Sequence, residues 1–274
     1  MFIIAYGSIK QQIFWCNYTY KITKSIKFIF LKIKGILLKT YTGSFMKKIV
    51  IIPAYNEHKN IVNVVNDIKM NAPDFDYIII NDGSTDDTIS LCIRNNFNVI
   101  NLPFNLGIGA CVQTGYIYAV ENGYDIAVQF DGDGQHKAKY LKNMYEKMLK
   151  TQSDMIIGSR YLNKDGYQST VLRRMGIRFL SKLIKILHKQ DIKDVTSGLR
   201  MVNNNLIAIF SEYYPYDYPE PETIAFCIRK KLKITEVPVL MEPRTEGNSS
   251  IGNIQSLYYM LKVSFSIIVD YFKN

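Results

Sequence analysis

The sequence predicts a single α/β domain built on a mostly parallel sheet that is flanked by helices. Short apolar runs of strand length alternate along the chain with segments whose apolar residues recur at helical spacing. This alternation is typical of parallel strands joined by crossover helices. With 274 residues, of which 47% are hydrophobic, the chain is long enough to bury one sizeable core.

The first strands are predicted from runs that are apolar throughout, because a parallel strand is covered on both faces. Residues 49–52 come first, and the helix predicted over 57–70 follows with apolar side chains three and four residues apart. A strand at 77–80 leads into a helix that begins with Asp86 and Asp87, and acidic residues suit the positive end of a helix dipole.

The same alternation continues to residue 157 and then loosens. We predict further strands at 98–100, 126–130, 155–157 and near 234–240. Further helices are predicted over 107–121, 140–149, 170–188 and 221–231, and an apolar helix over 253–274 ends the chain.

Residues 1–45 differ in composition from the rest of the chain. They contain seven lysines and no Asp or Glu, so they hold seven of the ten net positive charges and leave +3 for the remainder. The basic balance therefore indicates no nucleic-acid partner. Between Lys24 and Lys39, lysines alternate with large apolar residues, which is typical of an amphipathic arm on an anionic membrane surface. The alternative is an upstream extension without a folded role, since Met46 directly precedes the first core strand as a start codon would.

Simple counts disfavour several other classes of protein. Cys16, Cys92, Cys111 and Cys227 are far apart, which argues against a zinc site or a disulfide framework and favours reduced thiols. No stretch reaches the roughly 18–20 uncharged residues that span a bilayer, and the N-terminus lacks a convincing signal peptide. We therefore expect a cytoplasmic protein.

The most informative motif is Asp131-Gly132-Asp133, which directly follows the strand predicted at 126–130. Two carboxylates beside a core are costly unless a cation or hydrogen-bond donors satisfy them. Mg²⁺ and Mn²⁺ prefer such hard oxygen ligands, and they bind through one or two carboxylates together with substrate phosphates. We predict a metal site at Asp131 and Asp133, with Gln135 as a third oxygen ligand. The alternative is a solvated acidic turn.

Other polar motifs also follow strands, at the edge where ligands bind to open parallel sheets. One set is predicted to contact a nucleotide base and ribose, and it comprises Pro53, Tyr55, Glu57 and Asp82. Asn105 and Gly107 open a helix whose N-terminal N–H groups can bind an anion. Taken alone, each motif is better explained as a turn or a helix cap.

Several arginines are candidates for phosphate contacts, because the guanidinium fork matches phosphate bidentately. They are Arg160, Arg173, Arg174 and Arg200. The segment 244–250, which contains Arg244 and Ser249, suits a mobile loop that closes on a diphosphate. For each arginine the ordinary alternative is a surface charge or a structural clamp in the core. For segment 244–250 it is an ordinary connecting loop.

In their order along the chain, these motifs resemble the family 2 glycosyltransferases, which have the Rossmann-like GT-A fold. The matching stretches are PAYNE, NDGSTD, NLGIGA, FDGDGQH, GSR, TSGLR and EVPV with RTEGNSS. Within the family the chain is most similar to the dolichyl-phosphate mannosyltransferase and polyprenyl-phosphate glycosyltransferase group. The resemblance divides the chain into an extension, 1–45, a catalytic domain, 46–252, and a C-terminal helix, 253–274.

This resemblance implies an inverting transfer that depends on Mg²⁺ or Mn²⁺, from a GDP- or UDP-linked sugar to a polyprenyl phosphate. Asp133, through the metal ion that it would hold, and Arg244 would act catalytically, because the metal and the arginine would stabilise the leaving diphosphate. The resemblance places the metal at Asp131, Asp133 and Gln135, the nucleotide at Pro53, Tyr55, Glu57 and Asp82, the donor phosphates at Arg244 and Ser249, and further phosphate contacts at Arg160, Arg173 and Arg200.

Two departures from the family pattern affect the mechanism. Ile108 replaces a Lys or Arg of many relatives, which removes a phosphate contact, and segment 220–222 differs from the usual sequence near the acceptor-side acid. A phosphate acceptor needs no strong base, whereas a hydroxyl on a growing glycan or lipid-linked oligosaccharide would need one. Glu222, or else Glu220, is the candidate base. A nucleotidyltransferase and a non-catalytic scaffold that binds nucleotide sugars are less favoured alternatives.

The C-terminal segment predicts contact with a membrane. From Ile254 to Phe272 the apolar residues follow helical spacing over a wide face, which Lys262 interrupts. We expect this helix to lie at the bilayer interface or to dock on a small membrane protein, which would hold the protein peripherally at the cytoplasmic side of the inner membrane. Packing against the domain core is the alternative.

Overall fold

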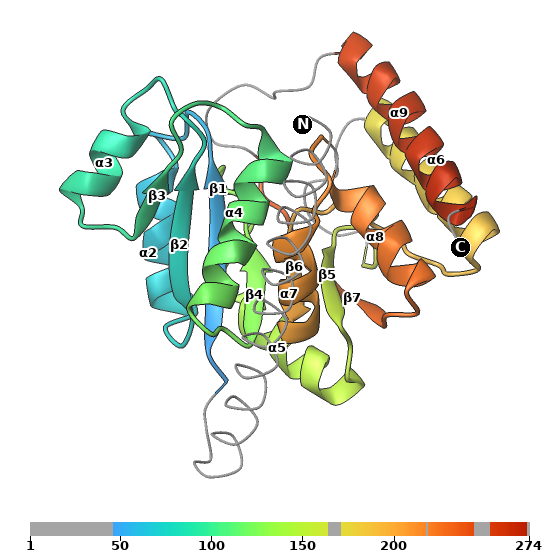
Figure 1. Cartoon of the computed structure of the whole chain (residues 1–274), viewed down its shortest axis with the longest axis horizontal. Coiled ribbons are helices and arrows are strands. Elements are labelled where there is room, and N and C mark those ends of the chain that lie inside the picture. The colour runs from blue at the N-terminus through green and yellow to red at the C-terminus, as the bar shows by residue number, and fades with distance from the viewer. Residues whose placement is uncertain (1–45, 164–170, 218, 244–252, 273–274) are drawn as a thin grey trace, which may run out of the picture. The chain divides into compact units, whose positions relative to one another are not determined.

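Seven strands form one sheet in the order β3-β2-β1-β4-β6-β5-β7 (Figure 1). All neighbouring strands are parallel except β6, which runs antiparallel to both β4 and β5. This confirms the predicted α/β class with a mostly parallel sheet. The strands are β1 (Lys48–Ala54), β2 (Asp76–Asn81), β3 (Val99–Asn101), β4 (Ile126–Gln129), β5 (Met155–Ser159), β6 (Arg200–Asn203) and β7 (Ile234–Pro238).

The structure is a computed structural model that describes residues 46–163, 171–217, 219–243 and 253–272, with backbone alone for 171–173 and 253–259. The chain divides into two compact units, Met1–Met46 and Lys47–Asn274, and every described helix and strand belongs to the second unit. The predicted amphipathic arm within 1–45 lies outside the described residues.

The described helices flank the sheet and extend beyond one end of it (Figure 1). In that view α4 and α7 lie in front of the strands, and α6 and α9 lie side by side. The helices are α2 (Ile61–Asn71), α3 (Thr88–Arg94), α4 (Ile108–Glu121), α5 (Tyr140–Thr151), α6 (Val171–His188), α7 (Asn204–Glu212), α8 (Pro219–Arg229) and α9 (Asn253–Phe272).

Two elements were not predicted from the sequence, namely β6 and α7. The TSGLR motif leads directly into β6, and this strand has only four residues, so hydrophobic periodicity gives little signal. Asn203 ends the strand and caps α7, because its side chain accepts a hydrogen bond from the Leu206 N–H. A second difference is that α2 begins at Ile61 rather than at residue 57, because residues 57–60 form a turn.

Helix α4 packs closely on the central strand β1. Gly115 allows this approach, because a Cβ atom there would lie 2.2 Å from Cγ2 of Ile51. Val112 and Tyr116 flank the glycine in the sequence and belong to the same buried cluster as Ile51. The close contact fixes the depth of α4 against the sheet and so sets the position of the loop that precedes it.

Helix α9 packs against α6 and α8 rather than standing apart. Val263 and Ile267 are buried in the main core cluster. The side of α9 that carries them therefore packs on the domain core, which is the alternative given in the sequence analysis. Leu261 and Phe265 lie on the opposite side and are 66% and 70% exposed. Among the described helices, none combines the length and hydrophobicity needed to cross a membrane.

Candidate active site

The acidic motif lies at the carboxyl end of β4, near the middle of the sheet. The chain stays beside β1 after β4 ends, because Phe130 N–H donates to the Ile51 carbonyl at 3.0 Å and Gly132 N–H donates to the Pro53 carbonyl at 3.3 Å. This pairing holds Asp131 at the edge where parallel strands end. Its side chain is 33% exposed, so it borders both the core and solvent.

The surroundings of Asp131 are unfavourable for a lone negative charge. Burial, followed by the charges of Asp133 and Glu220, raises the pKa of Asp131 to about 7. A hydrogen bond from Gln129 and the charge of Arg160 act in the opposite direction but are weaker. Ionisation of Asp131 is therefore unfavourable in the metal-free site, and a bound cation would favour the ionised carboxylate.

The donor set fits a hard divalent cation. In the part of the chain that the structure describes, no three or more His, Cys, Asp and Glu side chains form a metal-binding group. Two carboxylates with an amide oxygen are nevertheless sufficient where substrate phosphates complete the coordination, as is usual for Mg²⁺. The Gln135 side-chain N–H₂ donates to the Glu242 carbonyl at 3.2 Å, which leaves its amide oxygen for such an ion.

His136 lies beneath the acidic motif and is 3% exposed. Burial and the nearby Arg160 charge lower the pKa of His136 to about 4, so its imidazole is neutral near pH 7. Its Nε2 lies 3.8 Å from Oδ2 of Asp131, which is too long for a hydrogen bond. Its Nδ1 is buried without a hydrogen-bond partner among the described residues. His136 therefore contributes packing rather than charge.

The loop before β6 presses directly on the Asp131 carboxylate. A Cβ atom on Gly198 would lie 2.3 Å from Oδ2 of Asp131 and 2.9 Å from its Oδ1 and Cγ. Any side chain at this position would therefore displace the carboxylate. The sequence motif TSGLR was predicted to contact phosphate through its arginine, but its glycine is the residue that contacts the acidic motif.

Replacing Gly198 with Ala should reduce activity without unfolding the protein. The added methyl group must push the Asp131 carboxylate aside, and misplacement of a catalytic group by about 1 Å can cost about 10²-fold in rate. Gly123→Ala is the control for lost stability without a clash, because a Cβ atom there meets nothing within 4 Å but the φ of +68° strains an alanine, so its melting temperature should fall while its rate is kept. Initial rates and melting temperatures of both variants test the expectation, and full activity of Gly198→Ala would contradict it.

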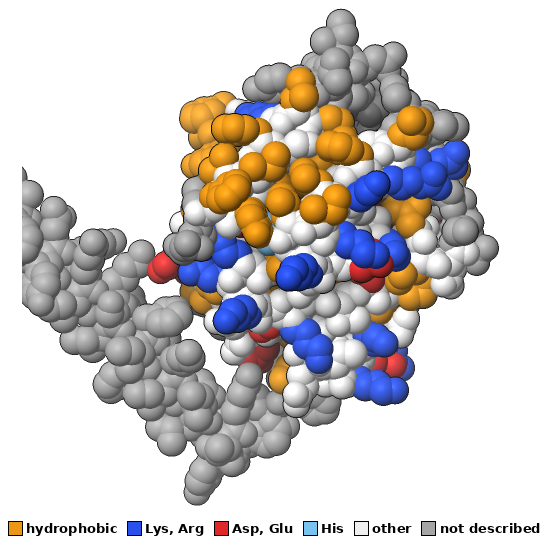
Figure 2. Space-filling model, turned by 90° about the vertical axis from the view of Figure 1, so that its right-hand side faces the viewer, with side chains coloured by type: hydrophobic (Ala, Val, Ile, Leu, Met, Phe, Trp, Pro, Cys, Tyr) orange, Lys and Arg blue, Asp and Glu red, His pale blue; other side chains and the backbone are white. Residues whose placement is uncertain are grey.

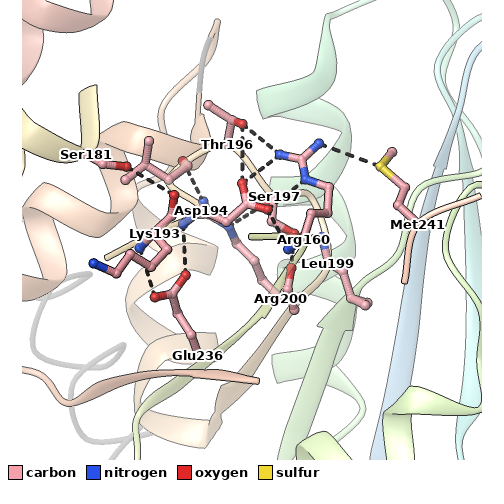
Figure 3. Close-up of polar contacts among 12 residues, drawn as sticks. Arg160, Ser181, Lys193, Asp194, Thr196, Ser197, Leu199, Arg200, Glu236 and Met241 are labelled. Carbon is pink, nitrogen blue, oxygen red and sulfur yellow. Dashed lines mark hydrogen bonds and ion pairs between the residues drawn. The ribbon is translucent and has the colours of Figure 1, made fainter. Parts of the chain in front are cut away.

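A buried polar network holds the Gly198 loop in place (Figure 3). Arg160 forms a two-pronged ion pair with Asp194, with Nε–Oδ2 at 2.7 Å and Nη2–Oδ1 at 2.6 Å. Its Nη2 also donates to the Thr196 hydroxyl at 2.8 Å. Glu236 of β7 accepts from the Asp194 backbone N–H at 2.8 Å. These contacts tie the loop to β5 and β7.

Arg200 braces the same loop from the other side. Its guanidinium donates to the backbone carbonyls of Val195, Ser197 and Glu220, and to the Thr223 hydroxyl. Arg200 is 1% exposed. Since its donors and those of Arg160 are engaged inside the protein, the geometry favours structural roles for both arginines over the predicted phosphate contacts.

Three predicted phosphate contacts lie outside what the structure describes. They are the side chains of Arg173, Arg244 and Ser249. The segment just before Arg244 is described, and it lies beside the acidic motif. Glu242 N–H donates to the Gln135 carbonyl at 3.0 Å, and the Glu242 carboxylate pairs with Lys137 at 2.9 Å.

The loops after β1 and β2, predicted to bind the nucleotide, are joined by side-chain hydrogen bonds. The Asn56 N–H donates to the Ser84 hydroxyl at 2.9 Å, and the Thr85 N–H donates to the Asn56 side chain at 2.9 Å. Glu57 is buried, and its N–H donates to the Thr88 hydroxyl. Tyr55 is 45% exposed and so offers a ring to a ligand.

Asp82 organises the loop before α4. Its carboxylate accepts from the N–H groups of Leu106 at 2.7 Å and Gly107 at 3.0 Å. Gly107 N–H also lies 3.0 Å from the Asn105 side-chain oxygen. The structure therefore brings Asp82, Asn105 and Gly107 together as predicted candidates, but it shows Asp82 engaged with backbone rather than free for a ribose.

The two candidate bases have different neighbours, which favour Glu220 over Glu222 as the carboxylate near the acidic motif. Glu222 hydrogen-bonds to Ser266 of α9 and lines a cavity of about 460 Å³ with Tyr216 and Phe265, where burial raises its pKa. Glu220 instead lies near Asp131, whose pKa its charge raises. Glu220 and Glu222 lie two residues apart in the first turn of α8. The sequence alone could therefore not show which carboxylate faces the acidic motif.

Gln129 is a site residue that the sequence analysis missed. It is fully buried, donates to the Glu220 carboxylate at 3.4 Å, accepts from the Tyr214 hydroxyl at 3.0 Å and hydrogen-bonds to Asp131. The available signal was a lone amide within the apolar run at 126–130. A buried amide of this kind needs partners, and those partners mark the site.

Comparisons with known proteins give a family and several relatives. The sequence model of the family described as glycosyl transferase family 2 matches residues 49–210. A UDP-N-acetylglucosamine–dolichyl-phosphate N-acetylglucosaminyltransferase from Methanococcus voltae is 33% identical over 209 residues, covering 69% of this chain and 83% of the relative. A polyprenol monophosphomannose synthase from Mycolicibacterium smegmatis is 24% identical, covering 80% and 86%.

The fold also resembles solved structures. Glucosyl-3-phosphoglycerate synthase from Mycobacterium tuberculosis, in complex with Mn²⁺, UDP and glucosyl-3-phosphoglycerate, superposes with a TM-score of 0.62. The sequence identity is 17%, and the match covers 82% of this chain and 80% of that one. The likeness shows that the two proteins share a fold.

Proposed function

The chain belongs to glycosyl transferase family 2 and is a glycosyltransferase, and from this premise we propose that it transfers a sugar from a nucleoside-diphospho-sugar to a polyprenyl phosphate. The transfer would proceed with inversion and would depend on Mg²⁺ or Mn²⁺. One observation carries the proposal: Asp131 lies at the carboxyl end of β4 beside Asp133 and Glu220, where burial and these two charges disfavour its ionised form and a bound cation would favour it.

The names of relatives support the choice of acceptor and donor. The Methanococcus voltae relative is named for transfer to dolichyl phosphate, and the Mycolicibacterium smegmatis relative is named for the synthesis of polyprenol monophosphomannose. The first relative is named for a UDP-linked donor, and the solved neighbour binds UDP with Mn²⁺, which favours UDP over GDP. A polyprenyl phosphate acceptor would be reached from the cytoplasmic leaflet, which makes peripheral membrane association part of the proposal.

The proposed chemistry follows from charge. A divalent ion, when bound, would offset the negative charge of the leaving diphosphate. Asp131 and Asp133 would hold this ion with Gln135, and Gly198 would fix the position of the Asp131 carboxylate. An oxygen of the acceptor phosphate would attack the sugar's anomeric carbon as the bond to the diphosphate breaks. Because that oxygen is already anionic, no proton has to be removed.

The proposal is tested by incubating the purified full-length chain with radiolabelled UDP- and GDP-sugars, undecaprenyl or dolichyl phosphate, and Mn²⁺ or Mg²⁺. We expect label in the organic phase only when a metal ion is present. A prior thermal-shift screen with UDP and GDP selects the donor, since a ligand at 100 times its Kd stabilises the fold by about 2.7 kcal/mol. Label that appears only on hydroxyl acceptors would contradict the proposed acceptor.

Mn²⁺ affinity should depend on pH through Asp131. A carboxylate ligand must be deprotonated before it binds a metal, and the pKa of Asp131 is raised to about 7. We expect the affinity to rise about tenfold per pH unit up to about pH 7 and then to level off. Calorimetric Mn²⁺ titrations between pH 5.5 and 8.5 measure this. An affinity that is flat across this range would contradict the assignment.

Glu220 and Glu222 distinguish a hydroxyl acceptor from a phosphate acceptor. Glu220→Gln should lower transfer to a hydroxyl by about 10²–10⁴-fold, because general-base catalysis contributes that much. Transfer to a phosphate should fall less than about tenfold, because the acceptor needs no base. Glu222→Gln is the matched control, since Glu222 faces α9, and should leave both rates unchanged. A large loss of phosphate transfer in Glu220→Gln would contradict this expectation.

A further inference from the structure

Helices α6 and α9 together present an apolar surface at one end of the molecule. They pack so closely that a Cβ atom on Gly176 of α6 would lie 2.9 Å from the Met260 sulfur of α9. Figure 2 looks onto this side of the molecule and shows hydrophobic side chains gathered over its upper part. We define the α6–α9 face by its exposed large apolar residues, Met175, Phe179, Ile186, Leu261, Phe265, Ile268 and Phe272.

The face is separate from the stripes that hold the two helices to the domain. Leu261, Phe265, Ile268 and Phe272 recur at intervals of four, three and four residues, so they form one outer stripe on α9. Val263 and Ile267 lie on the opposite side and are buried. The outer residues are therefore not required for packing. A contiguous exposed surface of this kind marks an interaction site.

Cationic side chains flank the apolar stripe of α6. Arg178, Lys182 and Lys189 are exposed and form no ion pair with any described residue. At about 100° per residue Arg178 and Lys182 lie on one flank of the stripe formed by Met175, Phe179 and Ile186, whereas Gly176, which faces α9, lies on the other. Lys189 directly follows the end of α6. Figure 2 shows Lys and Arg side chains below and beside the hydrophobic ones.

We propose that the α6–α9 face docks on an anionic lipid bilayer, with its apolar side chains in the interface and its cationic flank on the headgroups. A helix pair with this pattern lies in the interface plane rather than crossing it, in agreement with the finding that no described helix could span a bilayer. The inference extends the membrane contact predicted for α9 to α6, and it does not depend on which sugar is transferred.

Charge complementarity favours lipid over two other occupants. A second copy of the chain would bring the same unpaired cations to the same surface. Residues 1–45 contain seven lysines and no acid, so they would add positive charge rather than neutralise it. Anionic headgroups supply the missing charge.

The test is co-sedimentation of the full-length chain with phosphatidylcholine vesicles and with vesicles that contain phosphatidylglycerol. We expect binding to the anionic vesicles that weakens with salt. Phe179→Gln combined with Leu261→Gln should reduce the partition coefficient at least tenfold. The matched control is Met70→Gln with Ile93→Gln, which removes two exposed apolar residues from α2 and α3 and should leave binding unchanged. Lys182→Gln with Lys189→Gln should remove most of the preference for anionic vesicles.

Undiminished binding by the Phe179→Gln and Leu261→Gln variant would place the membrane contact elsewhere in the chain and overturn the proposal. A shift in oligomeric state in that variant, measured by light scattering without lipid, would assign the face to a second copy and would also overturn it. Binding is measured without donor or acceptor, so it succeeds or fails independently of the proposed reaction. Transfer to a water-soluble short-chain prenyl phosphate should be equal in the variant and the wild type.

Discussion

Asp131→Asn is expected to abolish sugar transfer while making the metal-free protein more stable. Loss of a metal-binding carboxylate removes several kcal/mol of charge stabilisation on the leaving diphosphate, so the rate should fall by at least about 10³-fold. The fold does not need this charge. Burial and the charges of Asp133 and Glu220 raise the pKa of Asp131 to about 7, which means that its ionised form is disfavoured in the folded state.

The sign of the stability effect follows from the two pKa values. An unfolded Asp has a pKa of about 3.9, so the folded metal-free protein loses stability as pH rises from about 4 through about 7. Asn carries no charge and removes this loss. Because the side chain is 33% exposed, we discount the effect to about 1 kcal/mol, which corresponds to a rise of about 2–4 °C in Tm at pH 8.

Melting curves in chelator at pH 5 and pH 8, together with initial rates in Mn²⁺, measure both effects. Glu121→Gln is the control, because it makes the same carboxylate-to-amide change at an exposed position on α4 and should alter neither quantity appreciably. A wild-type rate for Asp131→Asn, or a lower Tm than the wild type at pH 8, would show that the acidic motif is a structural turn and not a metal site.

The sequence predicted the parts of the site that are local along the chain. Asp131, Asp133 and Gln135 follow an apolar strand within a few residues, and that position alone predicts a metal site at the edge of the sheet. The loops after β1 and β2 were predicted to lie at the same edge of the sheet, because the carboxyl ends of parallel strands share one edge.

The parts that depend on distant contacts could not be predicted. Arg160 and Asp194 are 34 residues apart, and only the folded chain shows that the arginine is engaged by that carboxylate. Gly198 matters because its missing Cβ makes room for the Asp131 carboxylate, which no sequence pattern reports. The side chains of Glu220 and Glu222 leave the same segment in different directions. Hydrophobic periodicity does not predict these directions in a segment that is rich in proline.

The Arg160–Asp194 pair should be the largest single contribution of a polar contact to stability in this region. Arg160 is 5% exposed. Asp194 is fully buried, and its carboxylate accepts hydrogen bonds from the side chain and from the backbone N–H of Arg160. Asp194→Asn leaves a buried guanidinium without its counter-ion, which typically costs 3–5 kcal/mol. We expect Tm to fall by about 6–20 °C for a domain of this size.

Asp191→Asn is the matched control, because it makes the same change three residues earlier in the same loop. Asp191 pairs with Lys185 and Lys193 on the surface, and such pairs contribute about 0–1 kcal/mol. Urea unfolding of both variants measures the difference. Combining Asp194→Leu with Arg160→Met should recover stability relative to Asp194→Asn, since no charge is then left unpaired. Equal losses for Asp191→Asn and Asp194→Asn, or no recovery in the double variant, would show that the pair does not anchor the loop that positions Asp131.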